Sequence, residues 1–198
     1  MCTALLLWYN IIMDRRILPT TVLIGEKECP INTDYRDILD IFTIFNDPDL
    51  LDGDKVACAL DYFYQTDDYK EDIDTAVKEM MLFLQMGEDD TDNKEENVKP
   101  LYDWDQDFNI IVAPINKNMG TDIRNLDHLH WWTFFSAFME IGESTFSTFV
   151  GIRDKLNKGK RLDKTEEKIY KDNKDKIVLK RRYDSGTQEL IDEIMGRS

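Results

Sequence analysis

Residues 126–141, LDHLHWWTFFSAFMEI, form the most apolar segment of the chain and decide its fold class. On a helix, the polar side chains of this region fall into one narrow stripe, and the remaining surface is apolar. A helix that is apolar over most of its circumference has to be covered by other elements. We therefore expect residues 126–141 to form a helix at the centre of the core.

Amphipathic helices on the N-terminal side of this segment are expected to cover it. Apolar residues recur at helical spacing in four ranges, which are 33–46, 54–65, 70–86 and 104–118. Ile73 is expected on the buried face of the third range. Pro114 should kink or shorten the fourth helix, because proline lacks the N–H that a helix interior uses.

A short β-hairpin is expected before the first helix. Two β-prone runs, TTVLI and KECPI, flank Gly25 within residues 20–31, which is typical of two antiparallel strands with a turn at the glycine. Pro30 suits an edge strand because it cannot donate to a ladder. The predicted fold class is mainly α, a helical bundle-like domain with a small N-terminal β-hairpin.

The charges divide the chain into unequal parts. The net charge is −15, but residues 1–150 hold 11 basic and 30 acidic side chains, whereas residues 151–198 hold 14 and 10. We predict an acidic helical body over 13–150 and a basic helical C-terminal tail over 151–198, with helices near 164–179 and 187–195. We expect residues 1–12 to be an upstream extension or a misassigned start, with an additional strand or helix turn as the competing interpretation.

The run GEDDTDNKEEN, residues 87–97, lies within the acidic body and has no apolar residue. A charged segment without periodicity cannot contribute to a core, so we expect a mobile acidic loop here. This loop is a candidate boundary between two helical halves.

The composition favours a soluble protein of a reducing compartment. No run approaches the roughly 18 apolar residues that a membrane-spanning helix needs. Three widely and irregularly spaced cysteines argue against a disulfide framework. The strong negative charge disfavours binding to phosphate backbones and anionic membranes. We expect a cytoplasmic protein that binds neither nucleic acid nor membrane. The opposite charges of its acidic body and basic tail are compatible with self-association.

Catalytic and cofactor motifs are weak in this sequence. His128 and His130, with Asp127 beside them, suggest a metal site only weakly, because side chains two positions apart diverge on a helix. The glycines are isolated, and no serine lies in a nucleophile-elbow pattern. We expect that the protein is not an enzyme and that it binds neither a cofactor nor a metal ion. A metal-dependent hydrolase using the histidine pair is a remote alternative.

Two groups of residues are candidates for partner binding. Methionines are adaptable side chains that occur on surfaces accepting helical partners, and aromatic residues often anchor interfaces. The candidates are Trp131, Trp132, Phe135, Phe138, Met80, Met81 and Met86. Core packing is the competing interpretation for both groups, and it is favoured.

Trp131 and Trp132 are expected to differ in role. Neighbouring positions on a helix point about 100° apart, so both cannot point along one line into the same core layer. We expect Trp132 to be structural because later apolar residues continue its face, while the exposure of Trp131 is left open.

Four stretches, taken in order, resemble one known family. They are LPTTVLIGEKECPINTDYRDILDI (18–41), NDPDL (46–50), LYDWDQDFNIIVAPI (101–115) and LDHLHWWTFFSAF (126–138). In this combination the chain resembles the bacteriophage Gp15 family, which is encoded among the tail genes of long-tailed phages. The resemblance covers roughly residues 18–180 and brings no catalytic residues with it.

What the resemblance implies is a tail-assembly chaperone. Such a protein would bind the tape-measure protein, and possibly the tail-tube protein, in the host bacterial cytoplasm during phage assembly, and would be absent from the mature virion. An acidic nucleic-acid mimic that inhibits a DNA-binding enzyme is the alternative from another class, because its negative charge would suit that role. Mimic binding should collapse at high salt, whereas binding through apolar surface should persist.

Overall fold

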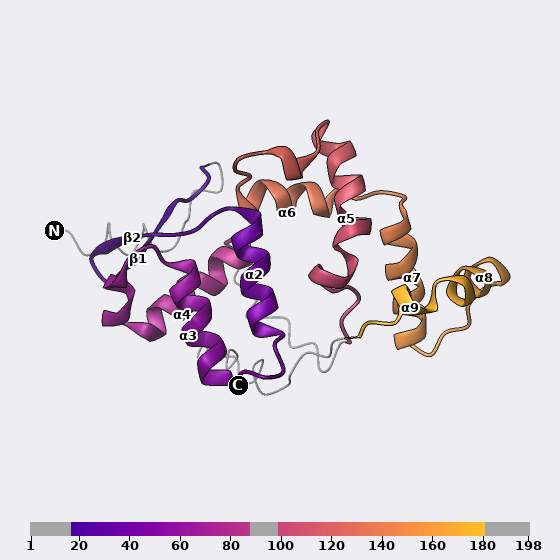
Figure 1. Ribbon diagram of the computed structural model, residues 1–198, viewed down its shortest axis with the longest axis horizontal. Coiled ribbons are helices and arrows are strands. Elements are labelled where there is room, and N and C mark those ends of the chain that lie inside the picture. The colour runs from indigo at the N-terminus through magenta and orange to yellow at the C-terminus, as the bar shows by residue number, and fades with distance from the viewer. Residues whose placement is uncertain (1–16, 88–98, 181–198) are drawn as a thin grey trace. The chain divides into compact units, whose positions relative to one another are not determined.

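The computed structural model describes residues 17–87 and 99–180, which belong to two compact units (Figure 1). Unit 1 contains residues 17–87 together with His130–Trp132, and unit 2 contains residues 99–129 and 133–180. The boundary along the chain falls near the charged run 87–97, and residue 150 lies inside a helix of unit 2. The predicted border between an acidic body and a basic tail stays a prediction.

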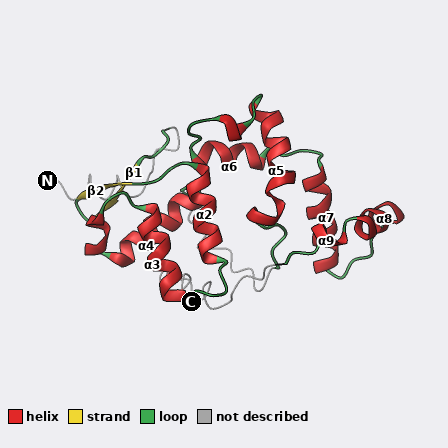
Figure 2. Ribbon diagram, in the orientation of Figure 1, coloured by secondary structure: helices red, strands yellow, loops and turns green. Residues whose placement is uncertain are grey.

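The mainly α fold with a small N-terminal hairpin is confirmed (Figure 2). Strands β1 (Thr21–Ile24) and β2 (Lys27–Pro30) pair antiparallel, with Ile24 opposite Lys27. Gly25 adopts a φ of 62° in the two-residue turn, a conformation that glycine reaches without steric cost. The predicted hairpin and its turn are thus both present.

The helices of unit 1 follow the predicted periodicity closely. They are α2 (Tyr35–Phe45), α3 (Asp52–Phe63), the 3-10 helix η1 (Asp67–Glu71) and α4 (Ile73–Leu84). Asp34 caps α2 by accepting from the Arg36 N–H, and Asp72 caps α4 by accepting from the Thr75 N–H. The apolar faces meet in a core whose fully buried members include Ile38, Ile41, Leu60, Phe63, Met80 and Phe83.

The first turn of α6 (Trp131–Met139) belongs to unit 1 and closes the end of α4. The indole N–H of Trp131 donates to the Leu84 carbonyl at 3.1 Å, and that of Trp132 donates to the Phe83 carbonyl at 2.9 Å. These carbonyls lie in the last turn of α4, where no residue within the helix can serve as their donor. The backbone N–H of Trp131 also bonds the Thr33 carbonyl at 2.7 Å.

Unit 2 contains the remaining helices. They are α5 (Trp104–Met119), the 3-10 helix η2 (Ile123–Asn125), the rest of α6, α7 (Thr145–Asn157), α8 (Lys164–Asp172) and α9 (Lys174–Ile177). Trp104 and Phe138 pack with ring centroids 4.6 Å apart, and Phe146 lies 5.4 Å from Phe138. This aromatic cluster links α5, α6 and α7.

A buried ion pair joins α5 to α7. The Arg153 guanidinium donates to both carboxylate oxygens of Asp107, at 2.6 and 2.9 Å, and both side chains are almost fully buried. Its other donors reach the carbonyls of Ile177 at 2.6 Å, Leu101 at 3.0 Å and Lys176 at 2.8 Å. One side chain therefore holds α9 and the segment before α5 against α7.

Several predicted details are wrong. Pro114 was expected to kink or shorten its helix, but α5 continues past it to Met119, so the helix is not shortened there. The kink stays a prediction. Ile73 is 44% exposed because it starts α4, before the buried face of that helix begins. The central helix starts at Trp131 rather than near 126, since Asp34 and His130 form an isolated β-bridge that keeps the chain extended.

Other predictions have a mixed outcome. The helix expected over 164–179 is interrupted at Asn173, and although α8 buries no residue, Ile177 of α9 is 1% exposed. Helix α7 was not expected. The extension 1–12, most of the loop 87–97 and the helix near 187–195 lie outside the described residues.

Replacing Arg153 by methionine should destabilise unit 2 by roughly 3–5 kcal/mol, because Asp107 would be left as a buried charge without its partner. The measurement is urea denaturation followed by circular dichroism. Lys158→Met, which removes an exposed i,i+4 pair with Asp154 on the same helix, is the control and should change the free energy of unfolding by less than about 0.5 kcal/mol. Equal effects of the two substitutions would contradict the structural role of Arg153.

Candidate functional site

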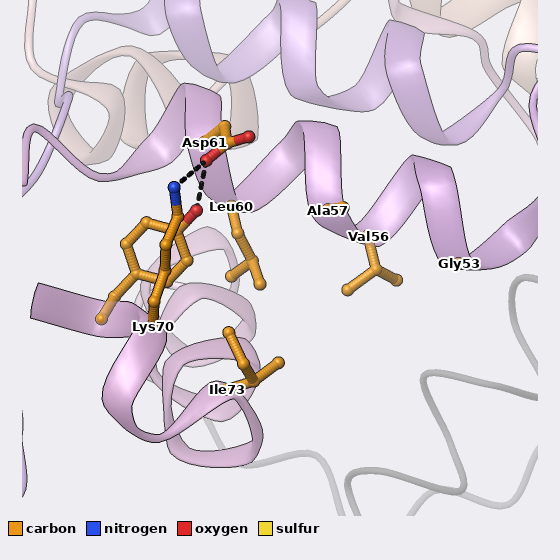
Figure 3. A pocket seen from close by; sticks show the side chains of 8 residues that line it. Gly53, Val56, Ala57, Leu60, Asp61, Lys70 and Ile73 are labelled. Atoms are coloured by element: carbon orange, nitrogen blue, oxygen red, sulfur yellow. Dashed lines mark hydrogen bonds and ion pairs between the residues drawn. The ribbon is translucent and has the colours of Figure 1, made fainter. Parts of the chain in front are cut away.

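The candidate site is an open apolar groove of about 360 Å³ in unit 1, between α3 and the start of α4 (Figure 3). Helix α3 contributes one continuous face to it, and η1 and α4 contribute the opposite side. The lining residues are Gly53, Val56, Ala57, Leu60, Asp61, Tyr69, Lys70 and Ile73. The volume falls in the range of about 300–1,000 Å³ that ligand sites occupy.

Helical spacing explains how α3 forms one wall. Gly53, Val56, Ala57 and Leu60 follow one another at i, i+3, i+4 and i+7, which places them on the same face of the helix. In Figure 3 the side chains of Val56, Leu60 and Ile73 point into the same open space. Ile73 is the large apolar side chain of the lining that remains substantially exposed.

Three polar side chains fix one end of the groove. The Lys70 Nζ lies 3.3 Å from Asp61 Oδ1 and 2.7 Å from Asp67 Oδ1, and the Tyr69 hydroxyl donates to Asp61. The hydrogen bond from Tyr69, followed by that from Lys70, lowers the pKa of Asp61. Burial, with the Asp61 hydrogen bond, raises the pKa of Tyr69 to about 12, so its hydroxyl remains a donor at neutral pH.

The segment that forms the groove is strongly acidic. Residues 52–74 contain eight carboxylates and two lysines. One of those lysines, Lys55, is fully buried and lies 3.9 Å from the Asp52 carboxylate. The other, Lys70, is bound to Asp61 and Asp67. Lys27 of β2 pairs with two more of these carboxylates, Asp68 at 3.3 Å and Glu71 at 2.5 Å. With Lys27 included, acidic side chains still outnumber basic ones by eight to three.

Two of these carboxylates adjoin the lining directly. Asp54 follows Gly53, and Asp74 follows Ile73, so each lies in the first turn of its helix. Neither makes an ion pair with a side chain in the ranges 17–87 and 99–180. Neighbouring helix positions point about 100° apart, so these two exposed carboxylates lie beside the lining face and not within it.

The residues predicted from the sequence lie elsewhere. Met80, Trp131, Trp132 and Phe138 are buried, with 0%, 0%, 3% and 7% of their surface exposed. Met81, Met86 and Phe135 are partly buried. The methionines and the tryptophans are in unit 1, whereas the phenylalanines are in unit 2. Both tryptophans are core side chains, so neither offers an exposed surface to a partner.

The periodicity of large apolar side chains does not reveal this groove. A small residue at Gly53 and another at Ala57 leave room above the face of α3, and that pattern was the available signal. Ile73 gave no signal because it fits the apolar periodicity of α4.

His130 is used by the fold. Its Nε2 lies 2.9 Å from the Pro19 carbonyl, and its Nδ1 accepts a hydrogen bond from the Trp132 backbone N–H at 3.1 Å. These two bonds select the neutral ring with its hydrogen on Nε2. His128 is exposed. Within residues 17–87 and 99–180, no group of three or more His, Cys, Asp or Glu side chains could hold a metal ion.

Within the described ranges 17–87 and 99–180, no helix combines the length and the apolar character needed to cross a bilayer.

A family model described as Bacteriophage Gp15 protein matches residues 14–179. No curated protein and no solved structure matches the chain significantly.

Trp131→Ala and Trp132→Ala should each lower the free energy of unfolding by roughly 3–5 kcal/mol, because each leaves a cavity in the core. Trp131→Ala also removes the indole donor of the Leu84 carbonyl, whereas the Phe83 carbonyl keeps the Met86 N–H as a donor. Chemical denaturation followed by near-ultraviolet circular dichroism measures the loss. Met139→Ala on the same helix is the control, since Met139 is 66% exposed, and it should have little effect. If a tryptophan variant is as stable as the control, that indole does not contribute to the core.

Tyr69→Phe should raise the pKa of Asp61 toward its ordinary value, because the hydroxyl that stabilises the carboxylate is removed. Because the folded-state pKa of Asp61 is depressed, its stabilising contribution is present above the ordinary aspartate pKa and is lost as pH falls through the folded value. Carboxyl titration by NMR measures the change. Tyr62→Phe, which removes a hydroxyl bonded to Asp40, should leave the pKa of Asp61 unchanged.

Proposed function

We propose that this chain, which belongs to the Bacteriophage Gp15 protein family, is a tail-assembly chaperone that binds the tape-measure protein in the cytoplasm of the infected bacterium. The observation that carries the proposal is the family match over residues 14–179, which covers most of the chain. The sequence resemblance described above implies the tail-assembly role, and the groove of unit 1 supplies a surface suited to it.

The groove supports a binding role by its chemistry. A helical protein that awaits enclosure in a tube exposes apolar faces, and a chaperone must cover them while keeping the complex soluble. The lining of the groove is apolar at Val56, Leu60 and Ile73, and the surrounding segment carries excess negative charge. Apolar contact would provide affinity, and the acidic exterior would oppose association of one complex with another.

Release is part of the same proposal. A groove of this size covers only a few partner side chains, so each contact would have modest affinity. Many copies along one tape-measure protein would together protect it, and tube subunits would displace them one by one. We further propose that the protein leaves during tube assembly, so that mass spectrometry of purified virions should not detect it.

Co-expression with the tape-measure protein of the same phage tests the proposal. The tape-measure protein should remain soluble only when this chain is present. Ala57→Gln should reduce the soluble fraction several-fold, because a polar side chain would occupy the apolar floor where Ala57 is exposed.

The matched control is Ala113→Gln, an equally exposed alanine on α5 in unit 2, which should behave as the wild-type chain. Both substitutions cost little helix propensity, so the melting temperatures should agree. A tape-measure protein that stays insoluble with the wild-type chain would overturn the chaperone role.

A further inference from the structure

We infer that the groove binds an amphipathic helical segment of a partner protein that carries lysine or arginine beside its apolar face. The inference rests on the proposed function and deepens it by naming the chemistry of the bound segment. It is carried by the shape of the groove and by the uneven distribution of charge around it.

The shape fits a helix. Residues 53–60 of α3 form a wall that extends over two helical turns, about 10 Å at 1.5 Å per residue. A side chain at Gly53 would meet no atom within 4 Å of its Cβ, so the end of the groove is open. A partner helix could therefore place side chains at i and i+4 into the space between Val56, Leu60 and Ile73.

The charges select a basic segment. Asp54 and Asp74 adjoin lining residues, and neither makes an ion pair with a described side chain. A cationic side chain that flanks the apolar face of the partner would meet one of these carboxylates. An acidic segment would instead encounter like charge, which disfavours its binding.

Asp61 provides a further position for a cation. It is bound by Lys70 at 3.3 Å, whereas the bond from Lys70 to Asp67 is shorter, at 2.7 Å. Lys70 is half exposed and can keep Asp67 while an incoming guanidinium takes Asp61. The planar guanidinium can bind a carboxylate through two parallel hydrogen bonds, which favours arginine at this point.

A segment of the chain itself suits the groove less well. Residues 187–195, TQELIDEIM, have an amphipathic pattern but contain three acids and no base. Their charge has the same sign as that of the groove, so a basic partner segment is the better complement.

The test uses labelled peptides of about 20 residues that tile the tape-measure protein, a length of about 30 Å as a helix, and fluorescence anisotropy with the full chain. The tightest-binding peptide should have an apolar face at helical spacing and a net positive charge. Replacing its lysines and arginines by glutamine, or raising NaCl from about 0.05 to 0.5 M, should weaken binding by about 3–10-fold without abolishing it.

Two pairs of variants locate the contact. Gly53→Gln should raise the Kd by about 10-fold or more, whereas Gly151→Gln, at an exposed glycine of α7 with equally open surroundings, should change it by less than about 2-fold. The double variant Asp54→Asn with Asp74→Asn should weaken binding of the basic peptide. Glu140→Gln with Glu143→Gln, which changes the net charge equally, should have a smaller effect.

Several outcomes would overturn the inference. The tightest-binding peptide could be neutral or acidic, or Gly53→Gln could leave the Kd of the peptide unchanged. A peptide of residues 181–198 could displace the bound peptide, which would make the C-terminal segment the occupant. Analytical ultracentrifugation could show a dimer that Gly53→Gln dissociates, which would make a second copy of the chain the occupant. If the tape-measure protein stays soluble equally well with Gly53→Gln and with the wild-type chain, the groove assignment alone fails. If the wild-type chain does not keep it soluble, the proposed function itself fails.

Discussion

The hydrogen bonds from two indole N–H groups to the end of α4 are the constraint on which unit 1 depends. Trp131 and Trp132 are adjacent, point in different directions and satisfy consecutive carbonyls, those of Leu84 and Phe83. The divergence of neighbouring helix positions, which left the exposure of Trp131 open in the sequence, is what lets the two indoles reach two acceptors. Since α4 also carries Ile73, these bonds help to fix one wall of the groove.

The sequence predicted those features of the fold that repeat with a regular period. The hairpin and helices α2 to α5 follow from alternation, helical spacing and turn residues, because each pattern extends over many positions. Features that depend on single contacts between distant residues were not predictable. Arg153 reads as one basic residue in a basic region, yet its five N–H groups all reach acceptors in unit 2.

The groove could not be predicted for a related reason. Its floor is formed by residues whose small size, at Gly53 and Ala57, is the relevant property, and periodicity in large apolar residues does not detect space. The candidates chosen from the sequence were large methionines and aromatic residues, and the largest of them fill the core. Aromatic enrichment is common to cores and interfaces, so it cannot separate the two without burial data.

The negative charge around the groove has a role in folding and, in the proposed complex, a second role in binding. Asp54 and Asp74 lie in first turns, where a carboxylate complements the helix dipole, so each favours folding whether or not a partner binds. A partner cation would then gain from charges already held in place, without any rearrangement of the backbone. Because both carboxylates are exposed, salt and water weaken each such contact. The proposed displacement during tube assembly requires this weakness, since a competing assembly must be able to replace the protein by mass action.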